Sequence, residues 1–295
     1  MPCYHPLKAY KLFSGEVVFI ERGDVVASLS LPCGRCVGCR LERSRQWAVR
    51  CMHEAQTHPV NSFVTLTYDD EHLPSGGSLD YRDFQLFAKR LRKRLGKFRY
   101  YMCGEYGEQT SRPHYHACLF GLDFPDKKPI RSRDGRPYLF DSRILSDLWG
   151  LGLCSIGAVT FESAAYIARY VMKKQTGEAA KLHYRRVDSE GEVFYLTPEF
   201  AHMSLKPGIG DTWFSRFSSD VYPSDQVISN GRPAKPPRRY DILLDRKDFS
   251  LLEDIKYRRL VNGISRRADS TDDRLAVREQ VAIARLNLKS RSLER

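Results

Sequence analysis

Hydrophobic and polar positions are most regularly ordered between residues 61 and 178. A run rich in β-branched and aromatic residues predicts a strand at residues 62–68, and three further strands are expected at residues 98–105, 114–121 and 153–161. Helical periodicity after a capping residue predicts helices from Asp80 to about Leu95, from Asp141 to Gly150, and from Ser163 through Lys174, before Gly177. The order β-α-β-β-α-β-α predicts an α+β fold with a ferredoxin-like or RNA-recognition-type antiparallel sheet and helices on one face.

The flanking segments predict two further domains. Residues 1–60 predict an N-terminal module, with a hairpin formed by residues 16–20 and 25–31, a cysteine cluster, and a helix over residues 41–57. Residues 179–295 predict a basic C-terminal region that is partly helical. In it we expect a Pro- and Arg-rich linker over residues 231–239 and helices at residues 246–262 and 273–288.

The net charge of the chain indicates the class of its binding partner. The 295 residues are 42% hydrophobic, enough for a sizeable core, and carry a formal net charge of +12, which favours a polyanionic partner such as nucleic acid. From Arg232 onward the sequence contains 17 Lys and Arg residues and 10 Asp and Glu residues. This basic excess indicates either a solvated helical tail or a nucleic-acid arm. No apolar run approaches the roughly 20 residues that span a bilayer, and the N-terminus has no signal-peptide core. We therefore expect a soluble intracellular protein without a membrane partner.

The chain has eight cysteines, and their clustering indicates metal ligation rather than disulfides. Cys33, Cys36 and Cys39 have a spacing that suits tetrahedral Zn²⁺, which needs a fourth ligand. Cys3 is the favoured fourth ligand and His5 is the next candidate. A reduced, metal-free loop and an iron–sulfur cluster are the alternatives.

A His-x-His pair in the third predicted strand is the strongest candidate for chemistry. His114 and His116 are two residues apart, so on a strand both imidazoles point to one face. Glu105 lies on the expected partner strand, and Glu108, in the predicted turn, is the alternative acidic residue. Imidazole and carboxylate ligands suit Mn²⁺, Mg²⁺ or Zn²⁺. The competing interpretation is two histidines that pack beside aromatic neighbours.

A pair of tyrosines on the last predicted helix adds a candidate nucleophile. Tyr166 and Tyr170 are four residues apart and share one helix face, with Lys173 and Lys174 about one turn further on. Tyrosines on amphipathic helices usually pack a core, and a nucleophilic one needs help because its ordinary pKa is near 10. Together, a metal and a tyrosine in a basic protein favour attack on a phosphodiester of nucleic acid.

Taken as a set, three motifs resemble those of the HUH endonucleases that initiate rolling-circle DNA replication. They are residues 63–68 (FVTLTY), residues 113–116 (PHYH) and residues 166–174 (YIARYVMKK), in the family's order. The paired tyrosines resemble those of the replication initiators of microviruses, which are small single-stranded DNA phages. Residues 1–6 (MPCYHP) and 33–40 (CGRCVGCR) are similar to the gokushovirus branch. The resemblance covers roughly residues 1–178.

The resemblance implies a site-specific nickase and strand transferase that acts on single-stranded DNA at a replication origin. By position, the metal ligands for Mg²⁺ or Mn²⁺ are His114, His116 and Glu105, and the alternating nucleophiles are Tyr166 and Tyr170. Lys174, or else Lys173, assists with phosphate charge. One tyrosine attacks and forms a 5′-phosphotyrosine link, and the second acts in closing the displaced strand into a circle.

The resemblance also implies partners and a location. The partners are single-stranded and replicative-form viral DNA, with the helicase, polymerase and single-strand-binding protein of the host, in the bacterial cytoplasm. No nucleotide cofactor is expected, because the phosphotyrosine ester conserves the broken bond and the sequence has no G-x-x-x-x-G-K-[ST] loop.

Two other functions remain open at this stage. The alternative to a nuclease is a non-catalytic, basic nucleic-acid-binding protein with a ferredoxin-like sheet. However, His114, His116 and Glu105 are unusual choices for stacking bases. A zinc-dependent hydrolase is less favoured, because the chain lacks H-E-x-x-H and the tyrosine pair would have no role.

Overall fold

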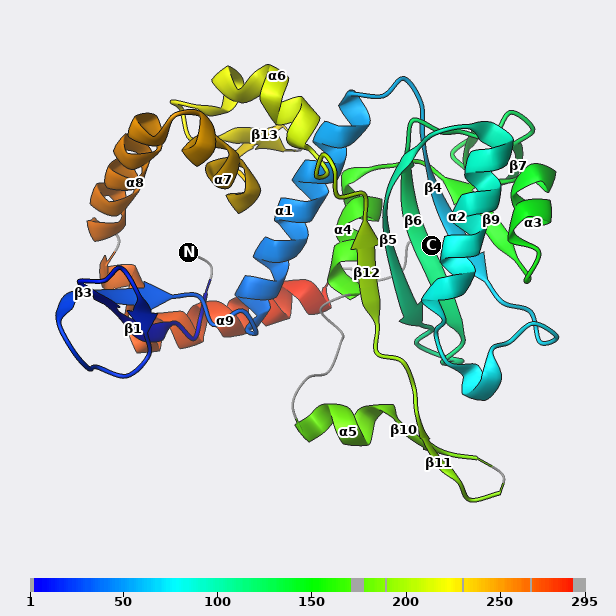
Figure 1. Cartoon of the computed structure of the whole chain (residues 1–295), viewed down its shortest axis with the longest axis horizontal. Helices are drawn as coiled ribbons and strands as arrows, with labels where there is room; N and C mark the ends of the chain where they lie inside the picture. The colour runs from blue at the N-terminus through cyan, green and yellow to red at the C-terminus, as the bar shows by residue number, and fades with distance from the viewer. Residues whose placement is uncertain (1–2, 171–177, 189, 230, 266, 289–295) are drawn as a thin grey trace. The chain divides into compact units, whose positions relative to one another are not determined.

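The computed structural model describes the chain except residues 1–2, 171–177, 189, 230, 266 and 289–295. It contains two compact units (Figure 1), one formed by Met1–Arg45 with Asp248–Arg295 and the other by Gln46–Lys247. The division into domains at residues 60 and 178 stays a prediction. Within the described ranges, no helix is both long enough and apolar enough to cross a membrane.

The larger unit is built on a seven-stranded antiparallel sheet in the order β12-β5-β6-β4-β9-β8-β7 (Figure 1). Its strands are β4 (Asn61–Thr67), β5 (Arg99–Tyr106), β6 (Pro113–Phe120), β7 (Lys128–Arg133), β8 (Arg136–Asp141), β9 (Cys154–Gly157) and β12 (Phe200–Met203). The four predicted strands are confirmed as β4, β5, β6 and β9, although β9 ends before Phe161. The prediction did not include β7, β8 and β12, and the fold is α+β as expected.

Two helices cover one face of this sheet, α2 (Tyr81–Leu95) and α3 (Arg143–Trp149) (Figure 1). The predicted apolar stripe of α2 is confirmed, because Phe84, Phe87 and Leu91 are fully buried against the sheet. Burying an aromatic or leucine side chain stabilises the fold by about 1.5–3 kcal/mol each.

The caps of these two helices follow their sequence signals closely. The Asp80 side chain accepts a hydrogen bond from the Arg82 N–H (2.8 Å) and starts α2 as predicted. The cap of α3 is Ser142, whose hydroxyl accepts from the Leu145 N–H (3.1 Å), so the prediction of Asp141 is wrong by one residue. Gly150 ends α3 in the left-handed conformation.

The opposite face of the sheet is covered by α1 (Val37–Gln56) and α4 (Phe161–Tyr170). The expectation of helices on one face is therefore wrong. Small side chains allow this second layer to approach closely: on α4 they are Ala164, Ala165 and Ala168. The predicted start of α1 at Leu41 is four residues late.

The start of α4 differs slightly from the prediction. Thr160 and Ser163 form reciprocal cap hydrogen bonds, in which the Ser163 N–H donates to Thr160 Oγ1 (3.1 Å) and the Thr160 N–H donates to Ser163 Oγ (2.8 Å). The helix therefore begins at Phe161. Its predicted end, at Lys174 before Gly177, lies outside the described residues.

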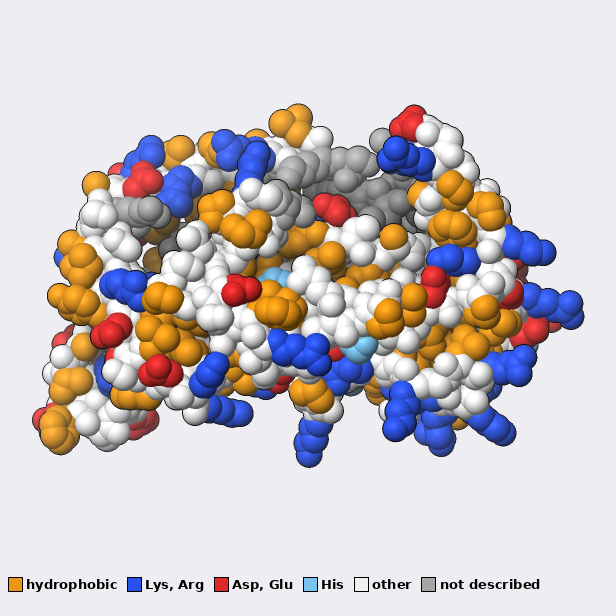
Figure 2. Space-filling model, turned by 90° about the horizontal axis from the view of Figure 1, so that it is seen from above, with side chains coloured by type: hydrophobic (Ala, Val, Ile, Leu, Met, Phe, Trp, Pro, Cys, Tyr) orange, Lys and Arg blue, Asp and Glu red, His pale blue; other side chains and the backbone are white. Residues whose placement is uncertain are grey.

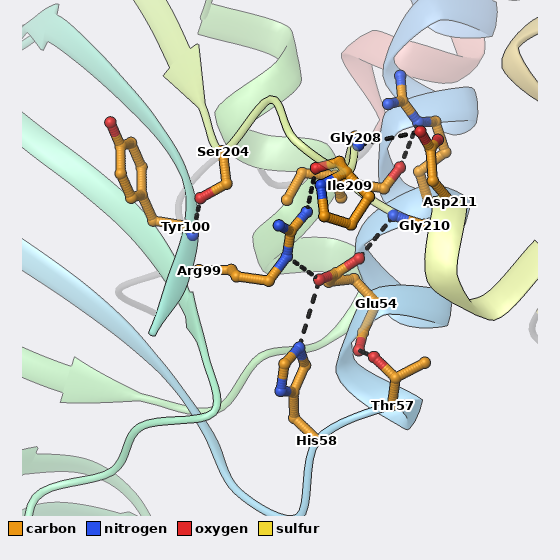
Figure 3. Close-up of polar contacts among 12 residues, drawn as sticks. Glu54, Thr57, His58, Arg99, Tyr100, Ser204, Gly208, Ile209, Gly210 and Asp211 are labelled. Atoms are coloured by element: carbon orange, nitrogen blue, oxygen red, sulfur yellow. Dashed lines mark hydrogen bonds and ion pairs between the residues drawn. The ribbon is translucent and has the colours of Figure 1, made fainter. Parts of the chain in front are cut away.

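A buried carboxylate ties α1 to the sheet and to α6 (Asp211–Val221), as Figure 3 shows. Glu54 on α1 accepts hydrogen bonds from Arg99 Nε on β5 (2.5 Å) and from the N–H of Gly210, which precedes α6 (2.7 Å). His58 Nε2 lies 3.3 Å from the same carboxylate. These contacts hold α1 in place against the sheet.

Further elements complete this unit. They are α5 (Glu178–Tyr184), β10 (Arg185–Val187), β11 (Val193–Tyr195), β13 (Val227–Ser229), β14 (Arg232–Ala234) and α7 (Arg238–Lys247). The stretch predicted as a linker over residues 231–239 is in fact occupied by β14, which pairs with β13, and by the start of α7.

The smaller unit contains a three-stranded sheet in the order β2-β1-β3, formed by β1 (Leu7–Leu12), β2 (Val17–Val18) and β3 (Val25–Leu31). The predicted hairpin between the second and third of these is wrong, because each pairs with β1 instead. The two predicted C-terminal helices are confirmed as α8 (Phe249–Ile264) and α9 (Asp272–Asn287), with ends shifted by one to three residues.

Candidate metal and tyrosine site

The pairing of β5 with β6 brings the predicted ligands together. Glu105 lies directly opposite His114, and Cys103 lies opposite His116. Residues two apart on a strand point to the same face, so both histidines and Glu105 share the face covered by α1 and α4. Glu108 instead lies in the exposed turn after β5. Register therefore places Glu105, and not Glu108, beside the two histidines.

The three side chains meet at short distances. His114 Nε2 and His116 Nε2 each lie 2.9 Å from the same oxygen, Glu105 Oε1. One ligand atom from each residue lies within 4.8 Å of the other two. The Glu105 side chain is 1% exposed, and its second oxygen, Oε2, is buried and has no hydrogen-bond partner among the described residues. A buried acceptor without a donor is costly, and a cation would remove this cost.

The far nitrogen of each ring fixes its orientation. His114 Nδ1 lies 3.0 Å from the carbonyl oxygen of Arg112, which can only accept, so Nδ1 donates to it and Nε2 points toward Glu105. His116 Nδ1 lies 2.9 Å from the Thr65 hydroxyl on β4. Partners of this kind at the outer nitrogen orient imidazoles that bind metals through the inner one.

These distances have an electrostatic consequence. A carboxylate and two imidazole lone pairs so close together repel one another unless a positive charge, a proton or a metal ion, lies among them. The buried Glu105–His114–His116 group could therefore bind a metal ion, and its donor set fits Mg²⁺, Mn²⁺ or Zn²⁺ alike.

The first predicted nucleophile lies beside this group. The Tyr166 ring on α4 packs edge-on against the His116 ring, with ring centroids 5.0 Å apart. Ile167 and Ala168 are buried against the sheet, which leaves Tyr166 half-buried at the rim of the helix contact. On the same face, the Phe63 ring stacks on the His116 ring at 5.6 Å.

The other predicted catalytic residues are not covered by the structure. Tyr170 is the last residue of α4, but its side chain lies outside the described part of the chain, as do Lys173 and Lys174. Their roles stay predictions.

Two residues at this site were assigned no role from the sequence. Thr65 and Phe63 alternate along β4 and face the histidines because β4 pairs with β6, with Thr65 directly opposite His116. Both belong to the run at residues 63–68 on which the resemblance partly rests. The alternation of residues in that run could have shown that Phe63 and Thr65 share one face of the strand. Their contact with His116 follows only from the pairing of β4 with β6.

Comparison with known proteins identifies the family. Residues 61–175 match the family described as replication-associated protein ORF2/G2P. The chain is 34% identical over 252 residues to the replication-associated protein VP4 of Bdellovibrio phage phiMH2K, covering 81% of this chain and 76% of that protein. It is 33% identical over 288 residues to the replication-associated protein ORF2 of Spiroplasma virus 4, covering 88% and 86%. The chain belongs to the replication-associated proteins of microvirus-type phages.

Further comparisons agree with this membership. The replication-associated protein ORF4 of Chlamydia phage 1 is 36% identical over 156 residues, which cover 50% of this chain and 39% of that protein. No solved structure matches the chain. The resemblance to microvirus replication proteins is thus confirmed, and the family match over residues 61–175 includes Glu105, His114, His116 and Tyr166.

This phage replication protein has a second cluster of metal-binding groups in its smaller unit. The sulfur atoms of Cys3, Cys33, Cys36 and Cys39 all lie within 4.8 Å of one another. Cys3 is therefore the fourth member of the cluster, as preferred from the sequence. The alternative, His5, is turned to another partner, since its Nε2 lies 2.6 Å from Glu279 on α9.

Backbone N–H groups around this cluster point at sulfur atoms. The N–H groups of Tyr4 and Cys39 donate to Cys36 Sγ (3.3 and 3.5 Å), and the Cys33 N–H donates to Cys3 Sγ (3.3 Å). Burial raises the pKa of the Cys36 thiol, but hydrogen bonds from the N–H groups of Tyr4 and Cys39 and from the Cys39 and Cys33 side chains outweigh it and lower that pKa to about 6. Burial instead raises the pKa of the Cys3 and Cys39 thiols. A thiolate at neutral pH is the form that binds metal. The four cysteines could therefore hold a metal ion.

Proposed function

We propose that the protein initiates rolling-circle replication of phage DNA by nicking one strand at the origin and later rejoining it. The observation that carries the proposal is the group formed by Glu105, His114 and His116 with the Tyr166 ring packed against His116. The order β4-α2-β5-β6-α3-β9, with β9-β4-β6-β5 adjacent in the sheet, supports the ferredoxin-like core of the HUH type. Membership among phage replication proteins supports DNA as the substrate.

In the proposed reaction, the Tyr166 oxygen attacks a phosphodiester of single-stranded DNA. The bond from tyrosine oxygen to phosphorus forms while the bond from phosphorus to the 3′ oxygen breaks. The tyrosine loses its proton and the leaving 3′ oxygen gains one, so the products are a 5′-phosphotyrosine and a free 3′-OH. No nucleotide is needed, because the new ester conserves the energy of the broken one.

The residues around Tyr166 would each have a defined task. A divalent ion held by Glu105, His114 and His116 would polarise the phosphate when bound. Thr65 and the Arg112 carbonyl orient the two imidazoles, and the edge contact with His116 holds the Tyr166 ring near them.

A second nucleophile would complete the replication cycle. We propose Tyr170 for this role, one helical turn from Tyr166, with Lys174 or Lys173 assisting phosphate charge. It would cleave the regenerated origin, so that the released 3′-OH closes the displaced strand into a circle. The host would supply helicase, polymerase and single-strand-binding protein in its cytoplasm.

The two groups of candidate metal-binding side chains suit different ions. Oxygen and imidazole ligands with an exchangeable phosphate suit Mg²⁺ or Mn²⁺ at Glu105, His114 and His116. Four thiolates suit a structural Zn²⁺ at the cysteine cluster.

The test is covalent capture of labelled single-stranded origin DNA, with Mn²⁺ or with EDTA, followed by a denaturing gel. We expect a metal-dependent protein–DNA band that is lost in the variant carrying Tyr166→Phe and Tyr170→Phe. Tyr195→Phe, at an exposed tyrosine on β11, is the matched control and should keep the band. If folded protein gives no band on an origin that supports replication, the chain is a non-catalytic nucleic-acid-binding protein instead.

A further inference from the structure

The solvent-exposed side of α2 carries charged residues of one sign only, all of them basic. All of its exposed positions except Gln85 are Lys or Arg: they are Arg82, Lys89, Arg90, Arg92, Lys93 and Arg94. The one acidic residue of the helix, Asp83, is not among them and accepts a hydrogen bond from the Tyr68 hydroxyl (2.6 Å). In Figure 2, Lys and Arg side chains gather at the edge of the molecule that carries α2.

Two of these basic side chains have structural tasks. The Arg90 guanidinium donates to the carbonyl oxygens of Leu148 (2.8 Å) and Trp149 (3.0 Å) on α3. The Arg92 guanidinium lies over the Phe98 ring, 4.7 Å from its centroid. Within the described chain, none of the remaining four, Arg82, Lys89, Lys93 and Arg94, makes an ion pair.

Helix energetics do not account for these four residues. A solvated helix face usually mixes both signs of charge, since like charges at i,i+4, as at Lys89 and Lys93, repel. The helix macrodipole favours Lys93 and Arg94 in the last turn, but it disfavours Arg82 in the first turn and is indifferent to Lys89. An external polyanion would turn this repulsion into attraction.

The shape and chemistry of the array favour the backbone of duplex DNA. From Arg82 to Lys93 the helix rises about 17 Å, which equals the rise of roughly five nucleotides along the axis of B-DNA. The exposed positions include no aromatic residue, whereas single-strand binders combine basic grooves with aromatic side chains that stack on bases. Arg82, Lys89 and Lys93 lie on one stripe of the helix, and Arg94 lies to the side of it. A stacking-free line of cations on a rigid helix matches a stiff duplex better than a single strand.

The location separates this face from the nicking site. Helix α2 packs on one side of the sheet, whereas Glu105, His114, His116 and Tyr166 lie on the side covered by α1 and α4. We propose that Arg82, Lys89, Lys93 and Arg94 form a second DNA-binding surface, which holds duplex phosphates without sequence preference. The proposal rests on the proposed function only in taking DNA as the polyanion.

The test compares two triple variants that lose the same charge. One carries Lys89→Ala, Lys93→Ala and Arg94→Ala. The control carries Arg131→Ala, Arg133→Ala and Arg136→Ala, at exposed positions of β7 and β8. Affinity for a 30-base-pair duplex and for a single strand of equal length is measured in EDTA at several salt concentrations, and nicking of a short origin strand is measured separately.

For the α2 variant we expect the slope of log affinity against log salt to fall by about 2–3 on duplex, or roughly 100- to 500-fold in affinity at 0.1 M salt. Single-strand nicking and thermal stability should be unchanged, since alanine is a good helix former. An unchanged duplex slope, an equal loss in the control variant, or an equal loss on single-stranded DNA would each overturn the proposal. Failure of wild-type protein to nick would instead refute the proposed function.

Discussion

Replacement of Glu54 should cost the larger unit a large part of its stability. The side chain is 1% exposed and joins three segments, because it accepts from Arg99 Nε (2.5 Å) and from the Gly210 N–H (2.7 Å) and lies 3.3 Å from His58 Nε2 (Figure 3). Alanine at this position would leave the Gly210 N–H without its acceptor and the Arg99 guanidinium without its carboxylate partner.

The expected size follows from these contacts. Breaking a buried ion pair by removing one partner costs about 3–5 kcal/mol, and an unsatisfied buried N–H costs about 1–3 kcal/mol. Arg99 is 19% exposed and keeps its bond to the Pro207 carbonyl, so the lower part of the range applies. We expect Glu54→Ala to lose about 3–4 kcal/mol and Glu54→Gln, which keeps one acceptor oxygen, about half as much. Total stabilities are only about 5–15 kcal/mol.

Urea unfolding followed by tryptophan fluorescence measures this loss. All three tryptophans, Trp47, Trp149 and Trp213, lie in the larger unit, so the signal reports on it alone. Glu178→Ala is the control, since that carboxylate is 90% exposed and should change stability by less than about 0.5 kcal/mol. A double-mutant cycle of Glu54→Ala with Arg99→Met should show strong coupling. A loss below about 1 kcal/mol for Glu54→Ala, or additive effects in the cycle, would refute this reasoning.

Three further predictions concern titration and metal binding. Burial lowers the pKa of His53 to about 4 from an ordinary 6.5. As the pH falls, His53 therefore becomes protonated at a higher pH in the unfolded chain than in the folded one. The stability of the wild type should therefore fall, by up to about 3 kcal/mol, as pH drops from about 6.5 toward 4, and the fall should be shallower in His53→Gln. Glu105→Gln should weaken Mn²⁺ binding, measured by calorimetry, by at least roughly 10-fold, whereas Glu108→Gln should bind like the wild type. Cys36→Ser should abolish zinc retained after purification, measured by elemental analysis, while Cys154→Ser should keep it; equal zinc in both would contradict the cluster assignment.

Elements with strong local signals could be predicted from the sequence. Helix α2 has both a cap, Asp80, and a regular apolar stripe, and the strand β4 is dense in β-branched and aromatic residues. Long-range pairing could not be predicted. The short strand β12 pairs with β5, which lies about a hundred residues earlier in the chain. Strands β2 and β3 each pair with β1 and not with each other. Such choices depend on tertiary packing, which short-range patterns do not encode.

The candidate site was more predictable than the layers around it. A short turn joins β5 to β6, so the pairing of Glu105 with His114 follows from two neighbouring strands. The side of the sheet taken by α4 did not follow, because an amphipathic helix can bury its stripe on either face. The contact between Tyr166 and His116 depends on this placement of α4, which could not be predicted from the sequence.

The register of β6 links the site to the core on the other side of the sheet. His114 and His116 face α4, so the residue between them, Tyr115, faces α2, where it is fully buried. Its hydroxyl donates to the Asp80 carbonyl at the start of α2 (2.6 Å) and lies 2.8 Å from the Tyr68 hydroxyl. A slip of one residue would turn both histidines into the α2 core and Tyr115 out of it. The alignment of Glu105 with His114 is therefore held from the opposite face of the sheet, by the packing of Tyr115 against α2.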